Sequence, residues 1–158
     1  MRKLTMQELN RLPVDDFKAT PKSPVVLVLD NVRSLHNVGA VFRTADAFAL
    51  EHIYLCGVTG QPPHREITKT ALGSTESVAW THTPTTLEAA QQLQAAGYQL
   101  VAVEQTTGSV PLPQFRPTLG ARWRWCWAMR YSASMTRCWP SAKWLWRYRS
   151  SAPSTRSM

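Results

Sequence analysis

Apolar runs and apolar periodicity alternate along the first two thirds of the chain. Short apolar runs at 25–29, 52–56 and 98–104 predict buried strands, and residues 77–80 predict a further short strand. The first run leads into a polar loop and a helix, whose apolar residues recur at helical spacing: Val38, Val41, Phe42, Ala45 and Phe48. Strands that alternate with helices in this way predict an α/β fold, with a parallel sheet covered on both faces.

Local signals place three further helical segments. Residues 85–97 form the clearest helix, with a threonine cap at Thr85 and Gly97 at the C′ position. Residues 64–73 predict a short helix or turn, and residues 5–12 a short helix with a capping box formed by Thr5 and Glu8. Residues 15–24 predict a polar connector. We therefore divide this part of the chain into an N-terminal extension and connector, 1–24, and an α/β domain, 25–118.

Charge and tryptophan are concentrated at the C-terminal end. The 158 residues carry a formal net charge of +8, but residues 1–120 contain ten basic and ten acidic residues, whereas 121–158 contain eight basic residues and no acid. Six of the seven tryptophans lie in the same segment. A solvated basic tail does not normally hold so many tryptophans, so residues 119–158 are interpreted as an aberrant tail.

The cysteines and the hydropathy pattern exclude several classes of protein. The three cysteines have neither CxxC spacing nor a nearby histidine pair, which predicts no metal site and no disulfide framework. Cys56 ends a predicted strand and is interpreted as a core residue. No apolar run approaches the ~20 residues of a membrane span. We expect a cytoplasmic protein that does not contact a membrane.

Polar side chains gather where the first predicted strand meets its helix. This stretch carries side-chain donors at the carboxyl end of a sheet, where α/β folds bind ligands: Asn31, Arg33, Ser34, Asn37 and Arg43. With the helix N-terminus they predict an anion site, and Arg33 and Arg43 are expected to reach one polyanionic ligand. Gly39 allows a close approach of backbone or ligand. The alternative is that the Asn and Ser residues are caps and the arginines are solvated.

The order of these residues resembles a known motif. Nine positions in fifteen match the first signature of the SpoU family of RNA ribose methyltransferases, in the SPOUT superfamily: Asn31-x-Arg33-Ser34-x-x-Asn37-x-Gly39-Ala40-x-x-Arg43-Thr44-Ala45. Segments 64–76 and 104–106 also look like this family. The resemblance covers residues 1 to about 118.

The resemblance implies a fold with a trefoil knot, S-adenosylmethionine as methyl donor, and a ribose 2′-hydroxyl of tRNA or rRNA as acceptor, normally in a homodimer. It implies catalytic roles for Arg43 and Asn37. The implied RNA-binding residues are Asn31, Arg33, Ser34, His64, Arg65 and Lys69, and the implied cofactor-binding residues are Val103, Glu104 and Gln105. An ordinary polar helix face remains the alternative for residues 64–69, and a loop start for residues 104–105.

The later motifs of the family do not occur in residues 119–158 as written. Read one base out of frame, the codons of Cys126-Trp127-Ala128 must give Val-Leu-Gly, and the following codons permit the family's Gly-Asn-Glu segment. We interpret this as a frameshift between about Gln114 and Trp123. The knot is then incomplete or absent and methyl transfer is impaired. The alternative function is a non-catalytic RNA-binding remnant.

Overall fold

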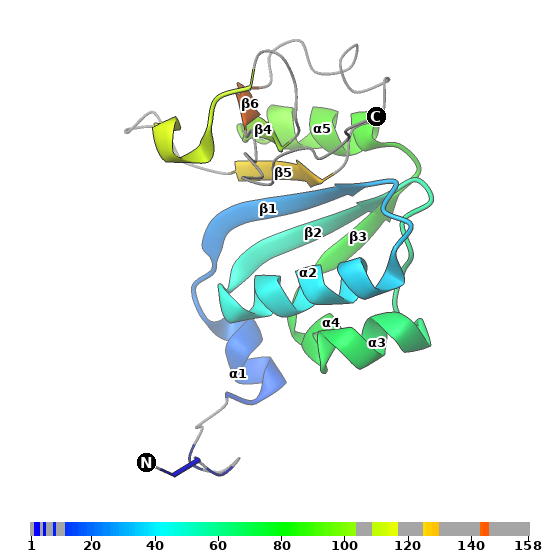
Figure 1. Ribbon diagram of the computed structural model, residues 1–158, viewed down its shortest axis with the longest axis vertical. Coiled ribbons are helices and arrows are strands. Elements are labelled where there is room, and N and C mark those ends of the chain that lie inside the picture. The colour runs from blue at the N-terminus through cyan, green and yellow to red at the C-terminus, as the bar shows by residue number, and fades with distance from the viewer. Residues whose placement is uncertain are drawn as a thin grey trace, which may run out of the picture.

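The computed structural model describes residues 2–3, 5, 8, 12–103, 109–116, 125–129 and 143–145. Its strands form one parallel sheet in the order β3-β2-β1-β5-β4-β6 (Figure 1). The strands are β1 (Ser23–Asp30), β2 (Leu50–Cys56), β3 (Trp80–Thr83), β4 (Gln99–Val103), β5 (Trp125–Met129) and β6 (Lys143–Leu145). The helices are α1 (Val14–Ala19), α2 (Leu35–Ala47), α3 (Arg65–Ala71), α4 (Ser74–Ser77) and α5 (Thr86–Ala95), with a 3-10 turn η1 (Leu112–Gln114).

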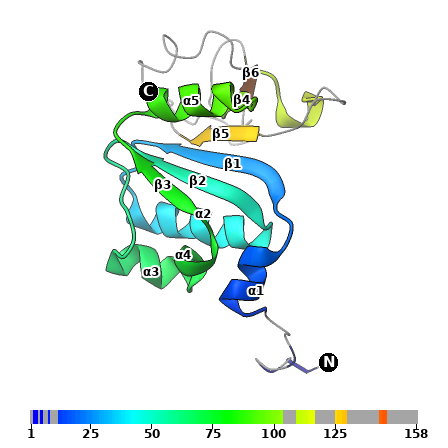
Figure 2. The same ribbon diagram turned by 180° about the vertical axis from the view of Figure 1, so that it is seen from behind.

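Helices cover both faces of the sheet. Figures 1 and 2 show α5 on one side, and α2, α3 and α4 on the other. One core cluster joins α5 to strands β1, β2 and β4, including Val28, Leu93 and Ala102. The other joins α2 and α3 to β1 and β2, including Leu29 and Phe42. The predicted α/β class and parallel sheet are therefore confirmed.

The predicted strands at 25–29, 52–56 and 98–104 are confirmed as β1, β2 and β4, but the strand predicted at 77–80 is wrong. Ser77 belongs to α4, and its hydroxyl donates to Asp46 Oδ1 at 2.5 Å. The strand begins at Trp80, which pairs with Ile53. A polar capping network therefore outweighs the β preference of this short run.

The predicted connector at 15–24 contains α1 and the start of β1. Pro13 precedes α1, whose first turn carries Asp15 and Asp16. Acidic side chains in a first turn favour a helix because they interact with its positive end. No residue of α1 is buried, so the apolar periodicity used for the prediction carries no signal here.

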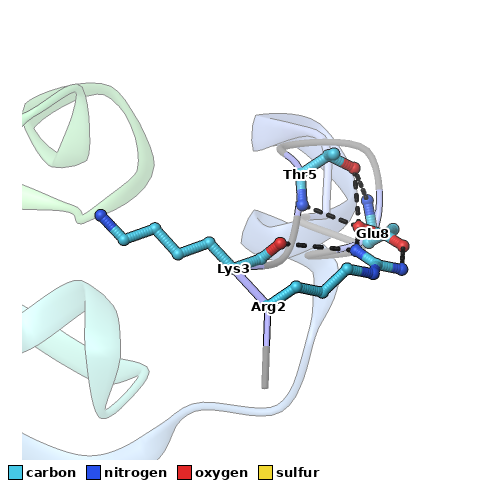
Figure 3. Close-up of polar contacts among 4 residues, drawn as sticks. All are labelled: Arg2, Lys3, Thr5 and Glu8. Atoms are coloured by element: carbon cyan, nitrogen blue, oxygen red, sulfur yellow. Dashed lines mark hydrogen bonds and ion pairs between the residues drawn. The ribbon is translucent and has the colours of Figure 1, made fainter.

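The helix predicted at 5–12 lies largely outside the described residues, but its capping box is present. The Glu8 carboxylate accepts from the Thr5 amide at 2.8 Å, and the Glu8 amide donates to Thr5 Oγ1 at 3.4 Å (Figure 3). Arg2 donates to the same carboxylate and, with the bonds from Thr5, lowers the pKa of Glu8 to about 2.

Two segments of the predicted tail join the sheet. Trp125–Met129 lies between β1 and β4, with Trp127 paired to Leu27 on one side and to Val101 on the other. Lys143–Leu145 pairs with β4 at the sheet edge. The amino-acid pattern of 121–158 predicts neither strand, because it has no apolar period.

Helix α2 packs closely against α3 through a glycine. Val38, Phe42 and Ala45 of α2 are buried as predicted, whereas Phe48 lies beyond the helix end and is 68% exposed. A Cβ at Gly39 would lie 1.9 Å from Thr70 Oγ1 and 2.6 Å from the Ile67 carbonyl oxygen. The expected close approach at Gly39 is thus made by the backbone of α3.

We predict that Gly39→Ala lowers the free energy of unfolding by about 1–3 kcal/mol, because the methyl group meets the Ile67 carbonyl as well as a side chain. Chemical denaturation measures the change. Thr70→Ala in the same chain should restore only part of the loss, since the carbonyl remains. Helix propensity alone predicts the opposite sign, a gain of about 0.5–1 kcal/mol, and a gain would contradict the close contact.

Candidate functional site

The loop between β1 and α2 is fixed by hydrogen bonds at both of its ends. Asn31 follows β1 with φ +52, a left-handed conformation that asparagine tolerates better than most residues. Its carboxamide donates to Asp30 Oδ1 at 2.7 Å and accepts from the Val58 amide at 3.2 Å. At the other end, Ser34 Oγ caps α2 by accepting from the Asn37 amide at 3.3 Å.

Three of the predicted site residues line one cavity beside this loop. The cavity has a volume of about 510 Å³ and includes Arg33, Ser34 and Asn37. Its other lining residues are mainly apolar: Leu29, Val32, Ala40, Val41 and Thr44. The side chains of Arg33 and Asn37 are exposed. The geometry gives an apolar floor with one guanidinium and one carboxamide, groups that suit a polar, anionic ligand.

Arg43 lines a different cavity from Arg33 and Asn37. That Arg33 and Arg43 reach one polyanionic ligand stays a prediction. Arg43 lines a hollow of about 470 Å³ beside α1, with Phe17, Asp46 and Leu72. Six residues separate Arg43 from Asn37, which corresponds to a rise of about 9 Å and a turn of about 120° away from the face that Asn37 shares with Val41.

Helix α3 carries the second predicted basic group. His64 caps α3, with Nδ1 accepting from the Glu66 amide at 3.2 Å. Arg65 and Lys69 are exposed and lie four residues apart, on one face of the helix. Glu66 instead faces α2, where its carboxylate lies 3.1 Å from His36 Nε2. The two cations are thus available to phosphate.

The predicted cofactor residues lie at the carboxyl end of β4 and directly after it in sequence. Val103 ends that strand half-buried and pairs with Met129, while Met129 also pairs with Leu29 of β1. Glu104 and Gln105 lie outside the described residues. The carboxyl ends of β1, β5 and β4 therefore lie side by side at one edge of the sheet. Strand β2 lies on one side of β1, and β5 and β4 lie on the other, so the order of the strands reverses at β1.

Buried polar residues near this edge carry no clear sequence signal. Asp30 is 2% exposed and accepts from Thr86 Oγ1 of α5 at 2.5 Å. Thr59, 3% exposed, donates to the Cys56 and Leu29 carbonyls, and accepts from the Val32 amide. Only the position of Asp30 at the end of an apolar run could have indicated it.

Cys56 is confirmed as a core residue, since it is buried, and its Sγ lies 3.1 Å from Thr83 Oγ1. Burial raises the pKa of its thiol, which keeps it unreactive. Within the part of the chain that the structure describes, His, Cys, Asp and Glu side chains form no group of three that could hold a metal. No helix among those residues is long and apolar enough to cross a membrane.

Comparison with known families and curated proteins gives a consistent result. Residues 24–129 match the SpoU rRNA Methylase family. The 23S rRNA (guanosine-2′-O-)-methyltransferase RlmB of Vibrio parahaemolyticus is 36% identical over 72 residues, covering 46% of this chain and 29% of that protein. RlmB of Vibrio vulnificus is 30% identical over 95 residues, covering 60% and 38%. The chain thus spans about a third of the length of these curated relatives.

Solved structures share the fold. An AdoMet-bound rRNA methyltransferase from Sinorhizobium meliloti matches with a TM-score of 0.70 and 23% identity, over 90% of this chain and 54% of that one. The SpoU methyltransferase AviRb from Streptomyces viridochromogenes, in complex with AdoMet, matches with a TM-score of 0.66 and 16% identity, over 90% and 57%.

We predict that Ser34→Ala lowers the free energy of unfolding by about 1 kcal/mol, because the first turn of α2 loses its side-chain cap. Ser34→Asp should keep most of the stability, since a carboxylate also caps. Thr44→Ala, at the same cavity, is the matched control and should change stability by less than about 0.5 kcal/mol. Thermal denaturation measures all three. An unchanged Ser34→Ala variant would show that the cap is dispensable.

Proposed function

This chain belongs to the SpoU rRNA methylase family, and from that premise we propose that it descends from an RNA 2′-O-ribose methyltransferase acting on rRNA guanosine. The observation that carries the proposal is the cavity at the carboxyl edge, where Arg33, Ser34 and Asn37 of the family motif meet. The names of the RlmB relatives support rRNA guanosine as the substrate.

The residues proposed to bind RNA lie among the described residues. Arg33 at the cavity and Arg65 and Lys69 on α3 are exposed cations that can neutralise phosphates. Asn37 lines the same cavity, and its proposed role is to orient a ribose or base edge through its carboxamide. Asn31 and His64, also predicted to bind RNA, have polar atoms bonded within the chain.

S-adenosylmethionine is the proposed cofactor, and it supplies the methyl group when bound. The edge formed by the ends of β4 and β5 fits a ligand of this kind, since α/β sheets bind ligands at such a reversal. Val103 is the described residue that would contact it, and Glu104 and Gln105 follow directly in sequence.

Arg43 has a limited chemical role in this proposal. A neutral ribose hydroxyl is a poor nucleophile and must lose its proton. A guanidinium stays protonated and cannot accept that proton, so Arg43 neutralises negative charge while a carboxylate or an RNA phosphate acts as base.

A homodimer follows from the same family premise. Apolar side chains are exposed around the Arg43 hollow, with Leu12 at 55%, Val14 at 42% and Leu72 at 64%. Clustered exposed apolar side chains are typical of an interaction surface. Residues from two chains can then meet at one substrate, which offsets the separation of Arg43 from Asn37.

We further propose that methyl transfer is impaired because residues 119–158 are read out of frame. The strand β5 has the sequence Trp-Cys-Trp-Ala-Met, whereas the shifted frame permits Leu-Val-Leu-Gly-Asn at the same five positions. Runs rich in Val, Ile and Leu are typical of central parallel strands, and the shifted frame permits three such residues where this frame has two tryptophans and a cysteine. Residues 1–118 keep the RNA-binding side chains, which favours an RNA-binding remnant as the second candidate.

The nucleotide sequence tests the frame directly. We expect the minus-one frame after about residue 120 to be open and to encode Gly-Asn-Glu. Stop codons in that frame, or other codons at those positions, would exclude the frameshift.

Two matched proteins test the function: the 158-residue chain, and a variant whose residues after about 120 follow the minus-one frame. We expect the variant to bind S-adenosylmethionine saturably in calorimetry and to methylate rRNA fragments, and the 158-residue chain to do neither. Saturable micromolar binding by the 158-residue chain would contradict the proposed impairment.

Both proteins should bind RNA in a salt-dependent manner. Lys69→Ala should weaken binding and reduce the salt slope by about 1. Lys18→Ala is the control. Lys18 belongs to α1, which lies at the start of β1, away from the carboxyl edge, so this substitution should leave RNA binding unchanged. Binding that is independent of salt would exclude phosphate contacts by α3.

A further inference from the structure

Asp30 is a deeply buried carboxylate at the carboxyl edge, 2% exposed, and the chemistry proposed above does not use it. Its Oδ1 accepts two hydrogen bonds, from Asn31 Nδ2 at 2.7 Å and from Thr86 Oγ1 at 2.5 Å. Its Oδ2 is buried and has no hydrogen-bond partner among the described residues. Burying a carboxylate with one unpaired oxygen costs free energy. The presence of Asp30 at this position therefore needs a structural or functional reason.

The bond to Asn31 continues into a second loop. Asn31 Nδ2 donates to Asp30, which leaves Asn31 Oδ1 to accept from the Val58 backbone amide at 3.2 Å. The same oxygen lies 2.3 Å from the place where a Cβ on Gly57 would stand, so glycine is required for this contact. The backbone amide of Asn31 also donates to the Cys56 carbonyl at 3.2 Å. Asn31 therefore fastens the end of β1 to the turn that follows β2.

The positions of residues 32–34 depend on these contacts of Asn31. Val32 follows Asn31 directly, and its amide donates to Thr59 Oγ1 at 3.0 Å. Arg33 and Ser34 come next, and Ser34 caps the helix that carries Asn37. The direction in which Arg33 and Asn37 leave the sheet thus depends in part on Asn31 and Thr59, which do not line their cavity.

We propose that Asp30 is a positioning residue for the RNA-binding edge: it orients the Asn31 carboxamide, and Asn31 holds the loop that presents Arg33 and leads to Asn37. The motif asparagine at position 31 then acts inside the protein and does not contact RNA. The proposal rests on the proposed RNA-binding function, but its structural half can be tested without RNA.

Hydrogen exchange tests the structural half on the full chain. Relative to the Ile53 amide, which donates to the Ala79 carbonyl just before β3, the Val58 amide should exchange about tenfold faster in Asp30→Ala and in Asn31→Gly. Glycine adopts a positive φ freely, so Asn31→Gly removes the carboxamide without backbone strain. This variant keeps the test valid if Asp30→Ala does not fold.

Two further variants separate positioning from general stability. Asp30→Asn keeps an oxygen acceptor and should retain the protection of Val58. Thr86→Val removes only the hydrogen bond from α5 to Asp30. It should lower stability but leave the ratio of the Val58 to Ile53 amide exchange rates unchanged. An unchanged ratio in Asn31→Gly, or an equal change in Thr86→Val, would overturn the proposal.

RNA affinity tests the functional half through non-additivity. Asn31→Gly should weaken RNA binding about threefold to tenfold, with little added effect once Arg33 is replaced by alanine, because both changes remove the same contact. In the Lys69→Ala background the same substitution should keep its full effect. Equal effects in both backgrounds would exclude a positioning role. If the unmodified chain binds no RNA, the proposed function fails, and the exchange ratios still decide whether Asp30 and Asn31 position the loop.

Discussion

The candidate site depends on how the chain leaves the central strand β1 and enters helix α2. Between Asp30 and Leu35 the backbone must leave the sheet, reverse at a left-handed residue and start a helix. Hydrogen bonds from the turn after β2 hold that short loop on one side, and the Ser34 cap holds it on the other. Because α2 then packs within backbone contact of α3 at Gly39, any shift of the loop would move both helices. The cations of Arg33, Arg65 and Lys69 therefore share one rigid support, although they lie on different elements.

The fold was predictable from the sequence where burial imposes a period. Strands β1, β2 and β4 and helices α2 and α5 all carry apolar residues at regular spacing, and the cap at Thr85 and the glycine at 97 mark the ends of α5 correctly. Where burial does not dictate the pattern, the prediction failed. The exposed helix α1 has no buried residue, and the four-residue helix α4 is held by serine hydroxyls. Phe48 fits the helical period of α2 but lies past its end, because the chain turns at Ala49 with φ +48.

The site was only half predictable, for a geometric reason. Arg33, Ser34 and Asn37 are neighbours in sequence and remain neighbours in space, so the motif locates their cavity. Arg43 belongs to the same motif, yet the helical rotation directs it to a hollow lined by α1. Asp30, Thr59 and Thr86 come from three separate segments, and no spacing rule unites them before the chain folds. Long-range polar contacts of this kind depend on strand order, which a local pattern does not contain.

The place of β5 in the sheet has a consequence for how the chain acquires its structure. Strands β1 to β4 and their helices occupy residues 23–103, but β1 and β4 are not hydrogen-bonded to each other, since β5 separates them. During synthesis the residues of β1 to β4 thus leave the ribosome before Trp125–Met129, the strand that joins the two halves. Until then each half presents an unpaired strand edge, which is a template for intermolecular pairing. Contacts of such long sequence separation also slow folding. Pairing of residues 125–129 therefore closes the sheet and covers the two strand edges of β1 and β4 that face each other.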